Sequence, residues 1–312
     1  MRTLARKIVT LDVCSTAVRL MAVNGQRVET WASIHLEPGL VHDGLIIDPT
    51  TVGARIRRLM KASETGERKV IASVCGLFST CRFAQVPQLE SEPTQESLTQ
   101  AASTAMPVPT EELYLAYQHI SGNGSGPMTL LIGTPKNHID TEMKAFRLSG
   151  VRPYILNLKV MALMRLVDPR LALIVNMEPD TIDIAIVLHG IPRIMRTVKL
   201  RPGVSAAERV ESLAQALQQT ALFFNAQHPR IAATFATPLY LAGPVADDPD
   251  IVDVIKRVIP YPYTPLAIQL ECPRDLPVSQ YAVNTGLALA ERSVHGHPAA
   301  HEERRERTET DD

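Results

Sequence analysis

The fold of this chain is decided by the stretch Val9-Thr10-Leu11-Asp12-Val13-Cys14-Ser15-Thr16-Ala17-Val18-Arg19-Leu20. Apolar runs on both sides of the polar centre predict two strands joined by a tight turn. Residues 173–187 in the second half have the same organisation, so we expect the same hairpin twice. At 312 residues, the length favours two domains, or one domain with insertions.

Composition narrows the class of protein. Apolar residues make up 45% of the chain and the formal net charge is −1, which predicts a sizeable core and no nucleic-acid partner. No CxxC pair occurs, so the cysteines are expected to be free thiols in a reducing cytoplasm. No apolar run reaches the roughly 18 residues that span a bilayer, which predicts no direct membrane insertion. The basic start, Arg2 to Lys7, leads straight into a strand, unlike a secretory leader.

Strand and helix patterns alternate along the whole chain, which predicts an α/β protein. We expect a first domain over residues 1–168. The order strand, helix, strand, strand, helix predicts a small α/β subdomain inserted at about 83–150. A second domain follows over 169–292, and a capping-box pattern, Ser205 to Glu208, opens its long helix. Residues 293–312 have almost no apolar side chain and are predicted to be a disordered tail.

Eleven short stretches, in order and spacing, resemble one protein family. They are Pro38-Gly39-Leu40-Val41, Asp43-Gly44, Ile47-Asp48, Val74-Cys75-Gly76, Arg82-Phe83, Val86-Pro87, Tyr117-Gln118, Leu131 to Lys136, Leu148 to Pro153, Tyr281-Ala282-Val283 and Gly286 to Leu289. Over about residues 8–291 the chain resembles PilM, the actin-like cytoplasmic protein of type IV pilus assembly, and more distantly the cell-division protein FtsA. The resemblance implies an actin-like ATPase fold, with two ribonuclease-H-like domains and a small α/β subdomain inserted in the first.

The first hairpin of actin-like ATPases carries Asp-x-Gly-[Ser/Thr], with a Lys or Arg a few residues on. The resemblance implies that the Asp helps to hold a metal, that the Gly admits the phosphate, and that the hydroxyls donate to it. Here Asp12, Ser15, Thr16 and Arg19 match this pattern, but Cys14 replaces the glycine. The cysteine side chain is expected to crowd the approach of a phosphate and to weaken the site.

The second hairpin departs further from the family pattern Asp-x-Gly-x-x-x-Thr-x-Asp. Thr181 and Asp183 match it, or are ordinary polar residues of a hairpin. Asn176 removes a carboxylate, and Glu178 places a negative charge where the glycine would face phosphate. Two unit charges about 4 Å apart repel by about 4 kcal/mol at an effective dielectric near 20. Unless another group compensates it, this repulsion opposes nucleotide binding more strongly than the missing glycine.

The part of the nucleotide cleft that would hold the adenosine is altered as well. The family's Gly-Gly becomes Gly243-Pro244, and the helical subdomain after the second hairpin is shortened to about one long helix. We therefore expect a vestigial nucleotide cleft, with no catalytic residue, no metal and no cofactor. Its residues are Asp12, Ser15, Thr16, Arg19, Thr181, Asp183 and Gly243. A nucleotide-binding ATPase that regulates pilus assembly, with ATP and Mg in this cleft, stays open as the alternative.

The resemblance also implies a partner. PilM proteins hold the cytoplasmic N-terminal peptide of PilN, an inner-membrane protein, in a groove between the first domain and its inserted subdomain. Parts of Phe83–Val86 and Leu113–Tyr117 would line that groove here, with Asn137–Leu148 behind. The expected function is a cytoplasmic scaffold without ATP hydrolysis, recruited to the inner face of the cell membrane. Whether it is also a homo-oligomer stays open.

Two other classes fit the sequence less well. An FtsA-like filament would end in an amphipathic membrane helix, and Ala299–Asp312 has no apolar face. A sugar or acetate kinase would need an acidic catalytic residue in an intact cleft, and the sequence offers no such constellation.

Overall fold

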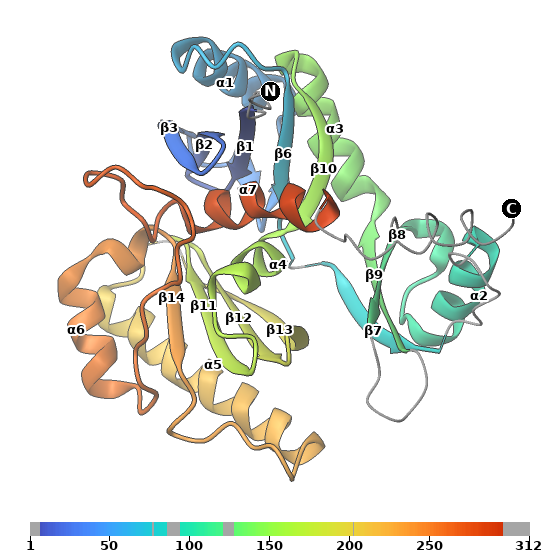
Figure 1. Ribbon diagram of the computed structural model, residues 1–312, viewed down its shortest axis with the longest axis vertical. Helices are drawn as coiled ribbons and strands as arrows, with labels where there is room; N and C mark the ends of the chain where they lie inside the picture. The colour runs from blue at the N-terminus through green and yellow to red at the C-terminus, as the bar shows by residue number, and fades with distance from the viewer. Residues whose placement is uncertain (1–6, 77, 86–93, 121–127, 202, 296–312) are drawn as a thin grey trace, which may run out of the picture.

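The structure, a computed structural model, describes residues 7–76, 78–85, 94–120, 128–201 and 203–295. Figure 1 shows two α/β halves, one above the other, with a smaller sheet to the right of them, level with their junction and the lower half. Helices α4 (Lys159–Leu163) and α7 (Ala282–His295) lie between the halves. Helix α7 ends inside the predicted tail 293–312, and residues 296–312 lie outside the described residues.

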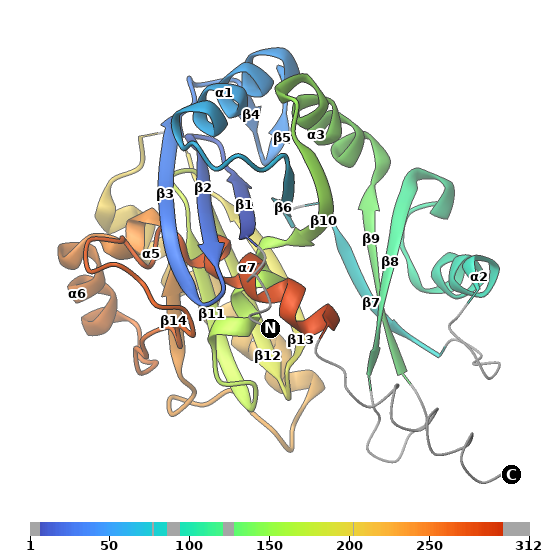
Figure 2. The ribbon, with the colours of Figure 1, turned by 45° about the horizontal axis from the view of Figure 1, so that its top comes forward.

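The upper half is built on a five-stranded sheet with the order β10-β6-β1-β2-β3, seen from another side in Figure 2. Strands β1 and β2 form the first predicted hairpin, and their antiparallel register sets Asp12 opposite Arg19. Strand β6 pairs in parallel with β1, and β10 in parallel with β6. The strands are β1 (Lys7–Val13), β2 (Ala17–Asn24), β3 (Arg27–His35), β6 (Lys69–Val74) and β10 (Arg152–Leu158).

The lower half repeats this arrangement with four strands in the order β13-β12-β11-β14. Strands β11 and β12 form the second predicted hairpin, in which Asn176 faces Asp183. Strand β14 pairs in parallel with β11, as β6 does with β1. The strands are β11 (Leu171–Met177), β12 (Thr181–Leu188), β13 (Ile191–Lys199) and β14 (Leu239–Ala242).

A shared core joins the two sheets. Apolar side chains of both sheets pack against α4 and α7, and in this layer Gly286 of α7 approaches α4 closely. A Cβ on Gly286 would stand 2.1 Å from the carbonyl oxygen of Ala162, so only glycine permits this contact. The halves are therefore held together over a continuous apolar layer as well as at the site described below.

Helices cover the outer face of each sheet. Helix α1 (Pro49–Ala62) begins at Asp48, whose carboxylate accepts from two backbone amides, and packs beside α3 (Lys136–Ser149) on the upper sheet. Helix α5 (Ala206–Gln227) begins with the predicted capping box, Ser205 and Glu208, and packs with α6 (Pro249–Val258) on the lower sheet. The 22-residue α5 is the one helix that the described chain places between β13 and β14.

The small sheet has the order β7-β9-β8 and is covered by α2 (Gln95–Ala105). Its strands are β7 (Thr80–Ala84), β8 (Leu113–Ile120) and β9 (Met128–Pro135). Helix α3, which the sequence grouped with this unit, packs Ala145 and Phe146 into the core of the upper half instead. A short ribbon, β4 (Val41–His42) and β5 (Leu45–Ile46), completes the described strands.

Candidate functional site

The turns of the two hairpins meet where the halves of the molecule join. Ser15, in the first turn, donates a hydrogen bond of 2.6 Å from its hydroxyl to the carboxylate of Asp180, in the second turn. The Thr16 hydroxyl stays in its own turn, 3.7 Å from the Cys14 sulfur. Burial raises the pKa of the Cys14 thiol to about 11, so this thiol is neutral at physiological pH.

Arg19 links the two halves at this junction. Its guanidinium donates to Glu178 through both terminal nitrogens, at 2.8 and 2.9 Å, and to Asp12 at 3.0 Å. Only 1% of Arg19 and 2% of Glu178 is exposed. A bidentate arginine–carboxylate pair has a fixed geometry, and burial strengthens its electrostatic attraction. The arginine expected to face a phosphate therefore binds a carboxylate of the second hairpin.

Lys159, at the start of α4, completes the group. Its ammonium lies 2.9 Å from Asp12, and the Ser73 hydroxyl donates to the same carboxylate at 2.6 Å. We call Asp12, Arg19, Lys159 and Glu178 the ion cluster. Lys159 is not among the residues predicted from the sequence. The signal was a single charged residue between apolar Leu158 and Val160, where a strand gives way to a helix.

The charges of the ion cluster cancel. Burial alone would raise the pKa of Asp12, but Lys159 and Arg19 lower it to about 2. Burial opposes ionisation of Glu178 as well, and Arg19 holds the pKa of that carboxyl below its usual value. The two carboxylates raise the pKa values of Arg19 and Lys159 against the effect of burial. Two anions and two cations thus neutralise one another out of contact with water.

Another buried carboxyl, that of Glu142 on α3, lies near this cluster, and Glu142 is 5% exposed. Burial raises its pKa to about 8; the charge of Lys159 opposes this shift and that of Asp12 adds to it. Glu142 is therefore mostly protonated at neutral pH. The ion cluster keeps its zero net charge without this side chain.

The polar residues of the second hairpin bind one another. Asp183 accepts hydrogen bonds from the Asn176 amide at 3.1 Å and from the Thr197 hydroxyl at 2.6 Å. Thr181 is buried, and its carbonyl accepts from the Glu178 amide across the turn. In this structure Asp183 thus takes part in hydrogen bonds within the hairpin and with β13, and Thr181 closes the turn through its backbone.

Gly243 stands at the end of β14 with φ of +90°. A Cβ there would lie 2.4 Å from the Met177 carbonyl oxygen and 2.9 Å from the Asn176 side-chain oxygen. The glycine lets this loop pack directly against the second hairpin. In the part of the chain that the structure describes, no three His, Cys, Asp or Glu side chains gather as a metal site would require.

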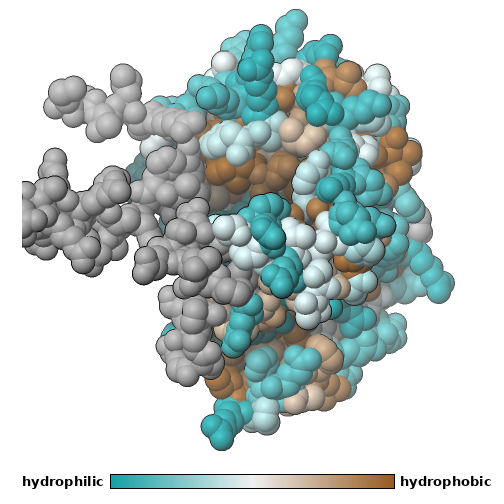
Figure 3. Space-filling model, turned by 90° about the vertical axis from the view of Figure 1, so that its right-hand side faces the viewer, coloured by the Kyte–Doolittle hydropathy of each residue, from teal (hydrophilic) through white to brown (hydrophobic). Residues whose placement is uncertain are grey.

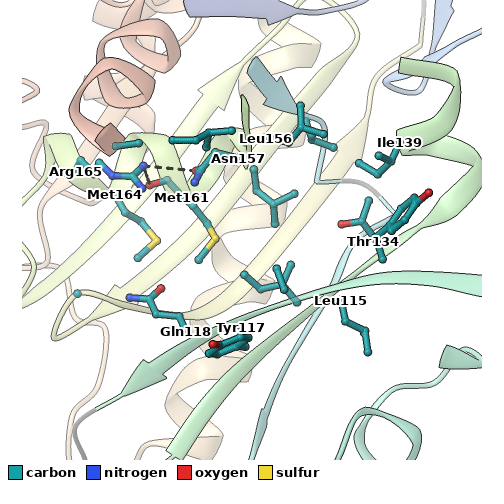
Figure 4. A pocket seen from close by; sticks show the side chains of 18 residues that line it. Leu115, Tyr117, Gln118, Thr134, Ile139, Leu156, Asn157, Met161, Met164 and Arg165 are labelled. Carbon is teal, nitrogen blue, oxygen red and sulfur yellow. Dashed lines mark hydrogen bonds between the residues drawn. The ribbon is translucent and has the colours of Figure 1, made fainter. Parts of the chain in front are cut away.

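A groove separates the small sheet from the upper half, and we call it the β8/β10 groove. Its cavity of about 790 Å³ is walled by β8 and β10 and floored by α4. Figure 3, which faces this side of the molecule, shows apolar surface in a recess framed by hydrophilic residues. In Figure 4, Met161 of α4 and Met164 of the 3-10 turn that follows it (Met164–Leu166) point across the cavity toward Tyr117 and Gln118 of β8.

The groove also has polar lining residues, among them Asn157 and Arg165. The Arg165 guanidinium donates to the Met161 carbonyl at 2.9 Å and contacts Asn157 at 3.5 Å (Figure 4). Burial lowers the pKa of Arg165. Both walls are edge strands, and no other described strand pairs with the outer edge of β8 or of β10. The groove therefore combines an apolar floor with two strand edges that pair with no other described strand.

The residues that the sequence predicted for the peptide groove lie only partly along the β8/β10 groove. Strand β8 and α3 do line it, but Phe83 lies on β7, which β9 separates from β8. The Phe83 ring instead packs 5.0 Å from the guanidinium carbon of Arg193 in the lower half. Val86 lies outside the described residues. The second wall is β10 with α4, elements that the sequence analysis did not predict.

Solved structures show the class to which this fold belongs. A PilM–PilN type IV pilus biogenesis complex matches with a TM-score of 0.75 at 17% identity, over 90% of this chain and 97% of the other. The cytoplasmic domain of EpsL, from the type II secretion system of Vibrio cholerae, matches at 0.54 and 11% identity, over 91% and 95%. A Bacteroides thetaiotaomicron protein with an actin-like ATPase fold matches at 0.51 and 11%, over 91% and 96%. The chain has the actin-like ATPase fold, as the sequence predicted.

A family model identifies the family. The model described as type IV pilus assembly protein PilM matches residues 10–199, more than half of the chain. The chain belongs to the PilM family. No curated protein matches its sequence. None of the described helices combines the length and the apolar character that crossing a bilayer requires.

Proposed function

We propose that this protein is a scaffold of a type IV pilus machine, or of a related secretion machine, and that it acts without hydrolysing ATP. Its β8/β10 groove holds the cytoplasmic N-terminal peptide of a PilN-like inner-membrane protein. That contact recruits it to the inner face of the membrane. The observation that carries the proposal is the groove itself, with two strand edges that no other described strand pairs with, above an apolar floor.

The groove suits an extended peptide. A strand that adds to β8 or β10 gains main-chain hydrogen bonds, while alternate side chains enter the cavity. Met161 and Met164 are flexible and polarisable, so they can adapt to the apolar side chains of a peptide. Arg165 supplies a cation for an acidic group. Belonging to the PilM family, together with the likeness to the PilM–PilN complex, supports a PilN-like partner.

The ion cluster supports the absence of catalysis. A nucleotide phosphate entering between the hairpins would meet the Glu178 carboxylate, and the nearest cations are already paired. To bind phosphate, Arg19 would have to release Glu178 and leave a buried carboxylate without its partner, which costs several kcal/mol. Cys14 adds a side chain where a glycine would admit the phosphate. These residues do not fit a magnesium–nucleotide complex, so we derive no hydrolytic step for them.

A titration tests the partner. The purified full chain is mixed with a fluorescent peptide of the N-terminal cytoplasmic segment from the PilN-like protein of the same organism. We expect saturable binding with a dissociation constant in the micromolar range, about −8 kcal/mol. A scrambled peptide of the same composition is the control. No binding at high micromolar concentration would exclude the proposed partner.

Thermal melting tests the second half of the proposal. A ligand that binds only the folded state raises Tm, so the peptide is expected to raise it while magnesium ATP leaves it unchanged. A clear rise with magnesium ATP would instead favour the nucleotide-dependent alternative.

A further inference from the structure

One end of the upper half carries a group of exposed cations. At this end α1 and α3 finish and β6 and β10 begin, at the top of Figure 1. A hollow lined by residues 66–69 and Arg152 lies among them. We call the six exposed cations here the basic end; they are Arg57, Lys61, Arg68, Lys69, Arg147 and Arg152.

Contacts between the four elements bring these cations together. The Arg152 amide donates to the Arg68 carbonyl at 2.8 Å, and the register of the parallel strands sets Arg152 opposite Lys69. The Arg57 guanidinium donates to the Leu148 carbonyl and so links α1 to the end of α3. The six side chains therefore belong to one continuous surface.

Positive charge prevails on this surface. The carboxylates that share it are Glu64 and Glu67, in the loop between α1 and β6, so six cations stand against two anions. Asp140, nearer the start of α3, accepts a hydrogen bond from Tyr114. Within the described residues, none of the six cations forms an ion pair with a carboxylate. The same two helices carry two further exposed cations, Arg58 and Lys144.

The fold alone does not account for this arrangement. Lys61 and Arg147 lie in the last turns of their helices, where a cation is favourable. Lys69 and Arg152 lie on adjacent strands, where like charges opposite one another are unfavourable. An anion outside the chain would relieve this repulsion.

We propose that the basic end binds the anionic lipid headgroups of the membrane that holds the PilN-like protein. The choice of a lipid surface rests on the proposed function, because the peptide in the β8/β10 groove continues into that membrane. Strand β10 connects the two places, since Arg152 begins it and residues 155–158 line the groove. One strand length, about 20 Å, thus separates the headgroups from the peptide.

Two exposed side chains beside the basic end suit a lipid interface. Leu148, near the end of α3, is 37% exposed, and Tyr154, on β10, is 39% exposed. Tyrosine is enriched at the level of the headgroups. Each cation near an anionic lipid surface strengthens binding about fivefold.

A nucleic acid fits the molecule less well. The whole chain has a formal net charge of −1, so the part outside the basic end is net negative. A long polyanion would extend from the basic end over this negative surface. A membrane meets only the face that is turned toward it.

Vesicle sedimentation of the full chain, without any peptide, tests the proposal. One set of vesicles is phosphatidylcholine, and the other is phosphatidylcholine with an equal amount of phosphatidylglycerol. We expect binding to the second set alone, and weaker binding as the salt concentration rises. Binding to neither set, or equal binding to both, overturns the proposal.

Charge reversal locates the contact. Lys69→Glu with Arg152→Glu should weaken vesicle binding about twenty-fivefold or more. Arg230→Glu with Arg257→Glu is the matched control, because both arginines are exposed on the lower half, and it should bind as the wild type does. Equal losses in the two double variants would overturn the proposal, because the net charge of the chain would then set the binding.

Unfolding by urea separates folding from binding. Lys69→Glu alone places a carboxylate opposite Arg152, so it should unfold at the same or a higher urea concentration than the wild type while binding vesicles more weakly. A parallel loss of stability and of vesicle binding would overturn the proposal, because the cations would then serve the fold.

Two further measurements identify the ligand. A single-stranded oligonucleotide at the same phosphate concentration should bind more weakly than the anionic vesicles, and tighter binding overturns the lipid assignment. The peptide titration contains no lipid and tests the groove alone, so Lys69→Glu with Arg152→Glu should bind the peptide as the wild type does. Vesicle binding without peptide binding refutes the groove and leaves the basic end, and peptide binding without vesicle binding does the reverse.

Discussion

The guanidinium of Arg19, in the first hairpin, donates two hydrogen bonds, of 2.8 and 2.9 Å, to the carboxylate of Glu178 in the second hairpin. The two residues are 159 positions apart in the chain, and both are buried. The negative charge of Glu178, which was expected to repel a phosphate, is instead paired with the positive charge of Arg19. One interaction both occupies the cation of the first hairpin and ties the two halves together.

Breaking this pair should destabilise the protein. Glu178→Ala leaves Arg19 buried with Asp12 as its remaining partner, and we expect the free energy of unfolding to fall by about 3–5 kcal/mol. The double variant Arg19→Met with Glu178→Leu removes both charges and should cost clearly less than the single change. Urea unfolding followed by circular dichroism measures both.

A surface pair provides the control for this prediction. Arg170 and Asp168 also form a bidentate contact, but the Arg170 side chain is 85% exposed. Asp168→Ala should therefore change the free energy of unfolding by about 1 kcal/mol or less. If Glu178→Ala has an effect as small as this, the ion cluster does not hold the halves together.

The hairpins could be predicted from the sequence because their signal is local. Each is a run of apolar residues, a polar turn and a second apolar run, and burial on both faces preserves this pattern. The partner of Arg19 could not be predicted, because a pairing over 159 positions leaves no periodic trace. The same holds for Lys159 of α4, whose carboxylate partner, Asp12, lies far from it in the sequence, on β1.

Strand β10, one wall of the β8/β10 groove, was not predicted from the sequence for a different reason. Strand β10 contains Pro153, and proline counts against a strand because it cannot donate to the ladder. The structure accommodates it with an irregularity in the pairing between Pro153 and Ile155, on a strand at the edge of its sheet. The edge position that tolerates the proline also leaves β10 free to line the groove.

Gly243→Ala should be strongly destabilising for two reasons, backbone strain and a steric clash of the new Cβ. Gly39→Ala introduces the strain without the clash, so comparing the two variants separates the two effects. Both glycines have φ near +90°, so alanine is strained at each by about 1–2 kcal/mol. A Cβ on Gly39 meets nothing within 4 Å, whereas on Gly243 it would stand 2.4 Å from the Met177 carbonyl oxygen. Gly243→Ala should therefore lower the midpoint of urea unfolding well beyond Gly39→Ala. Equal effects would mean that the close approach is unimportant.

Glu142 should make stability depend on pH. Burial raises its pKa from 4.5 to about 8, so between these values the folded chain keeps a proton that the unfolded chain has released. Stability therefore falls as pH rises through this window, by up to about 1.4 kcal/mol per pH unit. Glu142→Gln should flatten this dependence and unfold at higher urea than the wild type at pH 8.

The pH series contains its own control. Near pH 4.5, Glu142 is neutral in the folded chain, so Glu142→Gln and the wild type should be almost equally stable there. The stabilising pairing of Asp12 is lost only below its unfolded pKa of 3.8, down to about 2, and does not overlap this window. If Glu142→Gln lowers the free energy of unfolding by the same amount at every pH, the Glu142 side chain affects stability through its packing and not through its protonation.

The floor of the β8/β10 groove should decide the affinity for the proposed peptide. Met164 lines the cavity and is only partly buried, so Met164→Glu can fold while placing a charge against an apolar peptide side chain. We expect the dissociation constant, measured by fluorescence anisotropy, to rise about tenfold or more. Met164→Leu keeps an apolar floor and should bind within a few-fold of the wild type. Leu222→Asp, on the exposed face of α5, should bind normally. If Met164→Glu binds as tightly as the wild type, the peptide lies elsewhere.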